Sequence, residues 1–136
     1  MVITKDLIEE ELDYAEMIAE ECVPDFVKPN FVQIRLSNAR SFWGTVKHLG
    51  CGTYRLTVSN IFNDIEDNSN ASMRLTSTLV HEILHTQPGC MNHGRKWKAL
   101  AERVNREYPY LNIQRCTSSI SYGVERRKPV YKYKVT

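Results

Sequence analysis

The stretch His81-Glu82-Ile83-Leu84-His85 has the pattern H-E-x-x-H, and it decides how the rest of the chain is interpreted. It lies within residues 71–86, where apolar residues recur at spacings of three and four, so the sequence predicts a helix there. Positions i and i+4 of a helix share one face. We therefore expect the two histidine rings to point to the same side, where they can bind one metal ion.

Zinc is the expected metal, with one ion per chain. It binds neutral imidazole nitrogens and is stable with three protein ligands and a water molecule. It also lowers the pKa of that water toward about 7. Glu82 directly follows the first histidine, so its carboxylate is placed to take a proton from the water as the catalytic base of peptide-bond hydrolysis. The pattern thus favours a zinc-dependent endopeptidase that acts on protein or peptide substrates.

The third zinc ligand must come from outside this stretch. His93 is the favoured candidate, because it follows a Pro-Gly break and immediately precedes the next predicted helix, where a reversing chain can return to the metal. His48 lies in a predicted strand. Glu102 and Glu107 of the following helix are the remaining alternatives, and either would make a site of two histidines and one glutamate.

Around this centre the sequence predicts an α+β domain with a small antiparallel sheet. Alternating apolar and polar residues predict the strands, with Val32, Ile34 and Leu36 on one side of the first. Residues 111–116 and 130–135 have the composition of further short strands. The expected elements are a helix at 4–22, strands at 31–37, 42–49 and 53–61, a helix at 71–86 capped by Ser69 or Asn70, and a helix at 94–107.

Length and composition narrow the class of protein. The 136 residues have the size of a single domain. They include no apolar run of about 18 residues, as a membrane span requires, and the N-terminus lacks the pattern of a signal peptide. We therefore expect a cytoplasmic protein with no membrane partner. The four cysteines are scattered without a C-x-x-C pair and are expected to be mostly buried and reduced.

The charge is distributed unevenly along the chain. Residues 1–91 carry 7 Lys/Arg and 13 Asp/Glu, whereas residues 92–136 carry 11 Lys/Arg and 3 Asp/Glu. A basic C-terminal third either attracts nucleic acid or forms a solvated face, and the sequence leaves both open.

Two segments together resemble the SprT-like metallopeptidases, the family of SprT and Spartan-type proteases. They are Thr78–His85, which reads T-L-V-H-E-I-L-H, and Asn92–Lys98, which reads N-H-G-R-K-W-K. Members of this family carry H-E-x-x-H and then an H-G-x-x-[FW] segment that opens a helix. The resemblance covers roughly residues 5–116 of one domain, with a basic extension at 117–136.

The resemblance implies a zincin-like minimal metalloprotease core. This core has an N-terminal helix, a small antiparallel sheet, the H-E-x-x-H helix and a following helix. It also implies that His81, His85 and His93 bind zinc and that Glu82 is the catalytic acid and base. Because Spartan-type members digest proteins crosslinked to DNA, DNA-associated proteins are the implied substrates.

One departure from the family leaves an alternative function open. Many members continue into a zinc ribbon with four cysteines, but this sequence has no cysteine after Cys116, so the resemblance applies to the protease domain without the ribbon. The alternative is a non-catalytic zinc-binding module for protein interaction or nucleic-acid binding. A structural zinc site has four protein ligands, and Cys90 is the candidate for the fourth.

Overall fold

The structure is a computed structural model in which residues 1–115 are described. Its first element is the helix α1 (Lys5–Cys22), which begins where the Thr4 side chain accepts a hydrogen bond from the Leu7 N–H. Such an N-cap satisfies one of the free donors of the first turn. The buried residues of α1 recur at spacings of three and four, so one apolar stripe faces the protein interior.

The sheet contains three strands in the order β1-β3-β2: β1 (Asn30–Ser37), β2 (Gly44–Gly50) and β3 (Thr53–Ser59). The tight turn at 50–52 makes β2 and β3 an antiparallel hairpin, as expected. However, β1 pairs with the other edge of β3 in parallel, so the prediction of a wholly antiparallel sheet is wrong. The connection between β1 and β2 crosses the end of β3, where the Ser59 N–H donates to the Trp43 carbonyl and the Ser59 hydroxyl to that of Ala39.

The inward face of β1 also differs from the prediction. The register of β1 against β3 shifts between Phe31 and Gln33, which places a bulge at Val32. As a result Phe31 and Ile34 pack against the core, whereas Val32 and Leu36 are 53% and 44% exposed. In β3 the expected alternation is confirmed, because Tyr54, Leu56 and Val58 are all buried.

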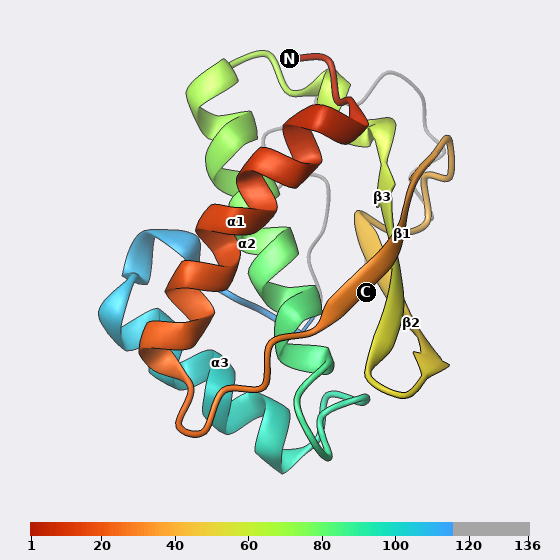
Figure 1. The fold of residues 1–136 in the computed structure, drawn as a ribbon. Coiled ribbons are helices and arrows are strands. Elements are labelled where there is room, and N and C mark those ends of the chain that lie inside the picture. Colours follow the sequence, from red (N-terminus) through yellow and green to blue (C-terminus); the bar gives the residue numbers. More distant parts are fainter. Residues whose placement is uncertain (116–136) are drawn as a thin grey trace.

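The helix α2 (Asn68–His85) runs through the middle of the molecule (Figure 1) and contacts α1, β2 and the helix α3 (Arg95–Glu107). It begins three residues earlier than predicted, and its cap is neither Ser69 nor Asn70. The Asp67 carboxylate instead accepts hydrogen bonds from both of their backbone N–H groups. Because α2 is surrounded, even its Thr76, Ser77 and Thr78 are buried.

Two short 3₁₀ helices replace strand segments that the sequence predicted. The strand β3 ends at Ser59 and is followed by η1 (Asn60–Asp64). The described part of residues 111–116 forms no strand, because the 3₁₀ helix η2 (Pro109–Leu111) leads into an irregular segment. The other expected strand, at 130–135, lies outside the described residues, as does the whole basic extension at 117–136.

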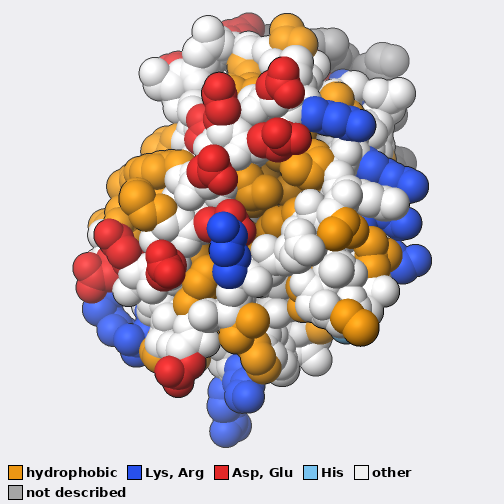
Figure 2. Space-filling model, viewed as in Figure 1, with side chains coloured by type: hydrophobic (Ala, Val, Ile, Leu, Met, Phe, Trp, Pro, Cys, Tyr) orange, Lys and Arg blue, Asp and Glu red, His pale blue; other side chains and the backbone are white. Residues whose placement is uncertain are grey.

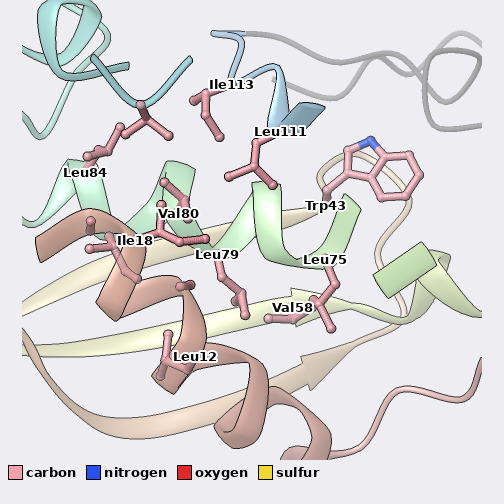
Figure 3. Close-up of a cluster of buried hydrophobic side chains, with 14 of the residues drawn as sticks. Leu12, Ile18, Trp43, Val58, Leu75, Leu79, Val80, Leu84, Leu111 and Ile113 are labelled. Carbon is pink, nitrogen blue, oxygen red and sulfur yellow. The ribbon is translucent and has the colours of Figure 1, made fainter. Parts of the chain in front are cut away.

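One cluster of buried apolar side chains connects α1, α2, α3 and the inner face of the sheet. Figure 3 shows this core, in which Leu75, Leu79 and Val80 of α2 lie between α1, the sheet and η2. None of the helices within residues 1–115 is long and apolar enough to cross a membrane. The three described cysteines are free, and two of them, Cys22 and Cys90, are buried, which agrees with the prediction.

Candidate metal centre

Three histidine rings converge where the end of α2 meets the start of α3. The Nε2 atom of His93 lies 3.0 Å from the Nε2 atom of His81 and 3.0 Å from that of His85. One ligand atom from each ring lies within 4.8 Å of the others, so these residues could hold a metal ion. Nitrogens bound about 2.0 Å from a tetrahedral zinc ion are about 3.3 Å apart. The observed spacing is therefore close to that of a zinc site.

A backbone carbonyl group fixes the orientation of the His85 ring. The Nδ1 atom of His85 lies 2.8 Å from the carbonyl oxygen of Cys90. A histidine whose Nδ1–H donates to a carbonyl presents its Nε2 lone pair to a metal ion. The fold therefore selects the tautomer of His85 that metal binding requires.

The Trp97 ring contacts all three histidine rings. Its ring centroid lies 4.7, 5.4 and 4.6 Å from those of His81, His85 and His93 respectively. It is 2% exposed, and its Nε1–H donates to the His81 carbonyl over 3.5 Å. A rigid aromatic side chain in contact with every ring limits the orientations that the rings can adopt. The sequence analysis included Trp97 as the aromatic position of the H-G-x-x-[FW] segment but did not predict its contact with the three rings, since helical spacing does not reveal which side chains a residue contacts.

The three histidines are held in their neutral form at pH 7. Burial and the two neighbouring histidines lower the pKa of His81 to about 3. Burial, together with His85 and Arg115, lowers the pKa of His93 to about 4. Burial lowers the pKa of His85 as well, although its bond to Cys90 opposes this. Neutral imidazole is the form that binds zinc, so the cluster needs no deprotonation before it binds a metal ion.

Glu82 lies beside the cluster with its carboxyl group enclosed by the protein. Its Oε2 atom is 3.8 Å from the His81 Nε2 atom, and the residue is 6% exposed. Burial raises the pKa of this carboxyl group well above its usual value. A carboxyl group whose pKa is raised toward neutrality is suited to accept and return a proton.

The start of β2 closes the site on the side of Glu82. A Cβ atom at Gly44 would lie 2.9 Å from Thr78 Cγ2 and 3.7 Å from Glu82 Cγ. Only a glycine therefore lets the strand come so close to α2. Sequence reasoning missed Gly44, which resembles any residue of a strand until the neighbouring helix is placed.

The other candidate ligands stay apart from the cluster. His48 is exposed and its ring packs against Tyr54, with 5.0 Å between centroids. Glu102 and Glu107 are not part of the histidine group, which is the one candidate group for a metal found within residues 1–115. The Cys90 thiol points to the carbonyl of Pro88 and does not join the group either. The predicted convergence of His81, His85 and His93 is thus confirmed, whereas their role as zinc ligands remains a prediction.

No protein-family model, curated protein or solved structure matches this chain.

Proposed function

We propose that this protein is a zinc-dependent metallopeptidase of the SprT-like type, with His81, His85 and His93 as zinc ligands and Glu82 as the proton-transferring residue. The observation that carries the proposal is the convergence of three neutral imidazole nitrogens beside one buried carboxyl group. The donor set suits zinc, since three histidines leave a fourth position open, as in catalytic rather than structural sites.

Zinc in this position would supply Lewis acidity, which activates water and polarises a carbonyl group. The protein supplies the rest of the chemistry. Glu82 takes a proton from the water that attacks the peptide carbonyl, and it later gives this proton to the nitrogen that leaves. The bond between His85 and the Cys90 carbonyl keeps the Nε2 atom of His85 directed at the other two rings.

The fourth position distinguishes this proposal from a structural zinc site. Cys90 was the candidate for a fourth protein ligand. However, its backbone carbonyl accepts a hydrogen bond from His85, and its sulfur points to the carbonyl of Pro88 instead of the cluster. This favours an open site over a closed one. The arrangement therefore supports the enzyme more than the non-catalytic zinc-binding module.

The test combines metal analysis with a peptidase assay on the purified protein. The parent should contain one zinc ion per chain and cleave an unfolded protein substrate, whereas Glu82→Gln should retain zinc and lose cleavage by at least about 100-fold. His93→Ala should lose both zinc and cleavage, and His48→Gln should lose neither. Equal cleavage by the parent and Glu82→Gln would reject the mechanism, and a zinc-free parent would reject the metal site.

We further propose that the substrates are proteins associated with DNA, as the resemblance to SprT-like proteases implies. The support is a group of exposed basic side chains at the start of α3, next to the cluster: Arg95, Lys96 and Lys98. The expected result is DNA binding whose affinity falls steeply between about 50 and 200 mM salt. Substitution of these three residues by Gln should weaken binding and flatten the salt dependence, and no binding at the lower salt concentration would reject this part of the proposal.

A further inference from the structure

A groove runs between α1 and β1, on elements that contribute no side chain to the histidine cluster. It consists of two adjoining hollows of about 390 and 320 Å³, which share Glu9, Phe31 and Ile34 in their walls. Leu12 and Pro29 complete an apolar floor. Figure 2 shows this face, where apolar side chains lie exposed between the carboxylates of α1 and the strand. A groove with an apolar floor and a polar rim is typical of a binding surface.

The charges along the rim are arranged in a definite order. The carboxylates Glu9, Asp13 and Glu16 all come from α1, whereas Lys5 and Arg35 line one hollow and Lys28 the other. No ion pair joins Glu9 or Asp13 to a cation within the part of the chain that the structure describes. The 18 residues of α1 include a single Lys and no Arg, although they include eight Asp and Glu. The wall of the groove that α1 forms is therefore negative, and the cations Lys5, Arg35 and Lys28 lie around it.

The third feature of the groove is an open strand edge. In the sheet order β1-β3-β2, the outer edge of β1 has no partner strand among residues 1–115. The free N–H and C=O groups of such an edge can pair with an added strand. Val32 and Leu36 of this strand are also exposed. Main-chain pairing would therefore be available to any extended segment that lies in the groove.

The spacing of the two acids selects the side chains of that segment. Residues i and i+4 of a helix have Cβ atoms about 6 Å apart, and residues i and i+2 of a strand are about 6.6–6.8 Å apart on one face. Glu9 and Asp13 thus match two cationic residues at alternate positions. Lys and Arg also carry long apolar stems, which can lie on Phe31 and Ile34 while their charged ends reach the rim.

We infer that this groove is a docking site for an extended peptide segment with the pattern Lys/Arg-x-Lys/Arg, which adds to the free edge of β1 and places its two cations against Glu9 and Asp13. The inference is independent of the proposed peptidase activity, because the groove and the histidine cluster share no residue. It adds a surface for basic extended segments, whatever reaction the cluster supports.

The experiment measures binding of a fluorescently labelled peptide that contains Lys-Val-Lys, by anisotropy at about 50 mM salt. The full-length Glu82→Gln protein is used so that cleavage cannot consume the probe. Glu9→Lys with Asp13→Lys in this background should weaken binding by at least about tenfold. The matched control is Glu10→Lys with Glu20→Lys, which makes the same change of net charge on α1 outside the groove and should change affinity by less than about threefold.

A second probe tests the strand pairing. The same peptide is made in two forms, with N-methyl groups on the odd-numbered or on the even-numbered backbone nitrogens. A methylated nitrogen cannot donate a hydrogen bond to a strand edge, so the form whose N-methyl groups face β1 should lose binding. Full binding by both registers, or equal losses in the groove and control variants, would overturn the inference.

The chain itself reads Lys-Tyr-Lys at 132–134, outside the described residues. Lys132→Glu with Lys134→Glu should leave the affinity for the probe unchanged. Tighter binding by this variant would assign the groove to the chain's own segment and overturn docking of a separate partner.

Discussion

Trp97 stacks nearly parallel to His85, with 21° between the ring planes and 5.4 Å between the centroids. The same indole ring contacts the other two histidines edge-on or tilted. One buried side chain of α3 therefore touches all three rings that come from α2 and from the loop before α3. This arrangement couples the packing of the two helices to the geometry of the site.

The first prediction follows from this contact. Trp97→Phe should raise the dissociation constant for zinc by about 10- to 100-fold, because the smaller ring leaves the histidines less well oriented. The loss should be visible by competition with a zinc chelator, and cobalt substitution should give a broader visible spectrum for the variant than for the parent.

Trp43→Phe provides the matched control for this measurement. Trp43 is equally buried, at 2% exposed, and packs against Phe62, with 5.0 Å between ring centroids. Both variants remove similar apolar volume and should lower the free energy of unfolding by a similar amount. If Trp43→Phe lost as much zinc affinity as Trp97→Phe, the effect would come from general loss of packing rather than from ring orientation.

The second prediction concerns the free energy of unfolding of the metal-free protein. Burial raises the pKa of Glu82. At pH 7 the folded protein must therefore either keep this buried group ionised or keep it protonated at a pH at which an exposed carboxyl group is ionised, and both cost free energy. Glu82→Gln removes this cost and keeps the shape of the side chain. We expect the variant to melt a few degrees higher than the parent when both are free of metal, as measured by calorimetry.

The direction of this effect should depend on pH. The pKa of Glu82 is higher in the folded state than in the unfolded state, so protonation of this group favours folding. This contribution to stability is fully present below the unfolded pKa of 4.5, and it is lost as pH rises through the folded pKa. The gain from Glu82→Gln should therefore disappear near pH 4, where the carboxyl group is protonated in both states. An equal gain at pH 4 and pH 7 would contradict the assigned cause.

The third prediction uses the histidines in the Glu82→Gln background, free of metal. The pKa of His81 falls from 6.5 to about 3 on folding, so its contribution to stability is present above pH 6.5 and is lost as pH falls toward the folded value. Between about pH 4 and 6.5 the unfolded chain binds more protons than the folded one. The free energy of unfolding should therefore decrease with acidification, with up to about 1.4 kcal/mol per pH unit from His81.

Urea unfolding at a series of pH values measures this slope. His81→Gln should reduce it, whereas the same change at His48, which is exposed and outside the cluster, should not. A slope that His81→Gln leaves unchanged would show that other groups cause the acid sensitivity.

The parts of this protein that the sequence predicts well are those that depend on local spacing. The helical spacing of H-E-x-x-H places two rings on one face, and the Pro-Gly break before His93 returns the chain to them. Likewise the apolar stripes of α1 and α3 give their extents to within one residue. In each case the deciding residues lie within a few positions of one another.

The parts that the sequence did not predict depend on contacts between distant segments. Strand alternation does not state which edge of β3 receives β1, so the parallel pairing was missed. The start of α2 was misplaced because its first turn, from Asn68, is polar and offers no apolar marker, although Asp67 is a good cap. The roles of Trp97 and Gly44 likewise depend on which neighbours the fold brings to them.

The last prediction tests Gly44 as the residue that sets the distance between β2 and α2. Its backbone needs no positive φ, so space alone limits substitution there. In Gly44→Ala the new methyl group would lie 2.9 Å from Thr78 Cγ2, and the strand must move away from the helix that carries Glu82. We expect a loss of about 1–3 kcal/mol in the free energy of unfolding, together with reduced peptidase activity.

Thr78→Ser separates crowding from other causes, because it removes the Cγ2 atom and keeps the hydroxyl group. The double variant Gly44→Ala with Thr78→Ser should recover at least half of the lost stability, since the crowded pair no longer meets. Thr57 cannot relieve the crowding in this way, because its nearest atom to the new methyl group is a backbone oxygen at 3.5 Å. If the effects of the two changes were simply additive in urea unfolding, close contact between β2 and α2 at Gly44 would not be what requires a glycine there.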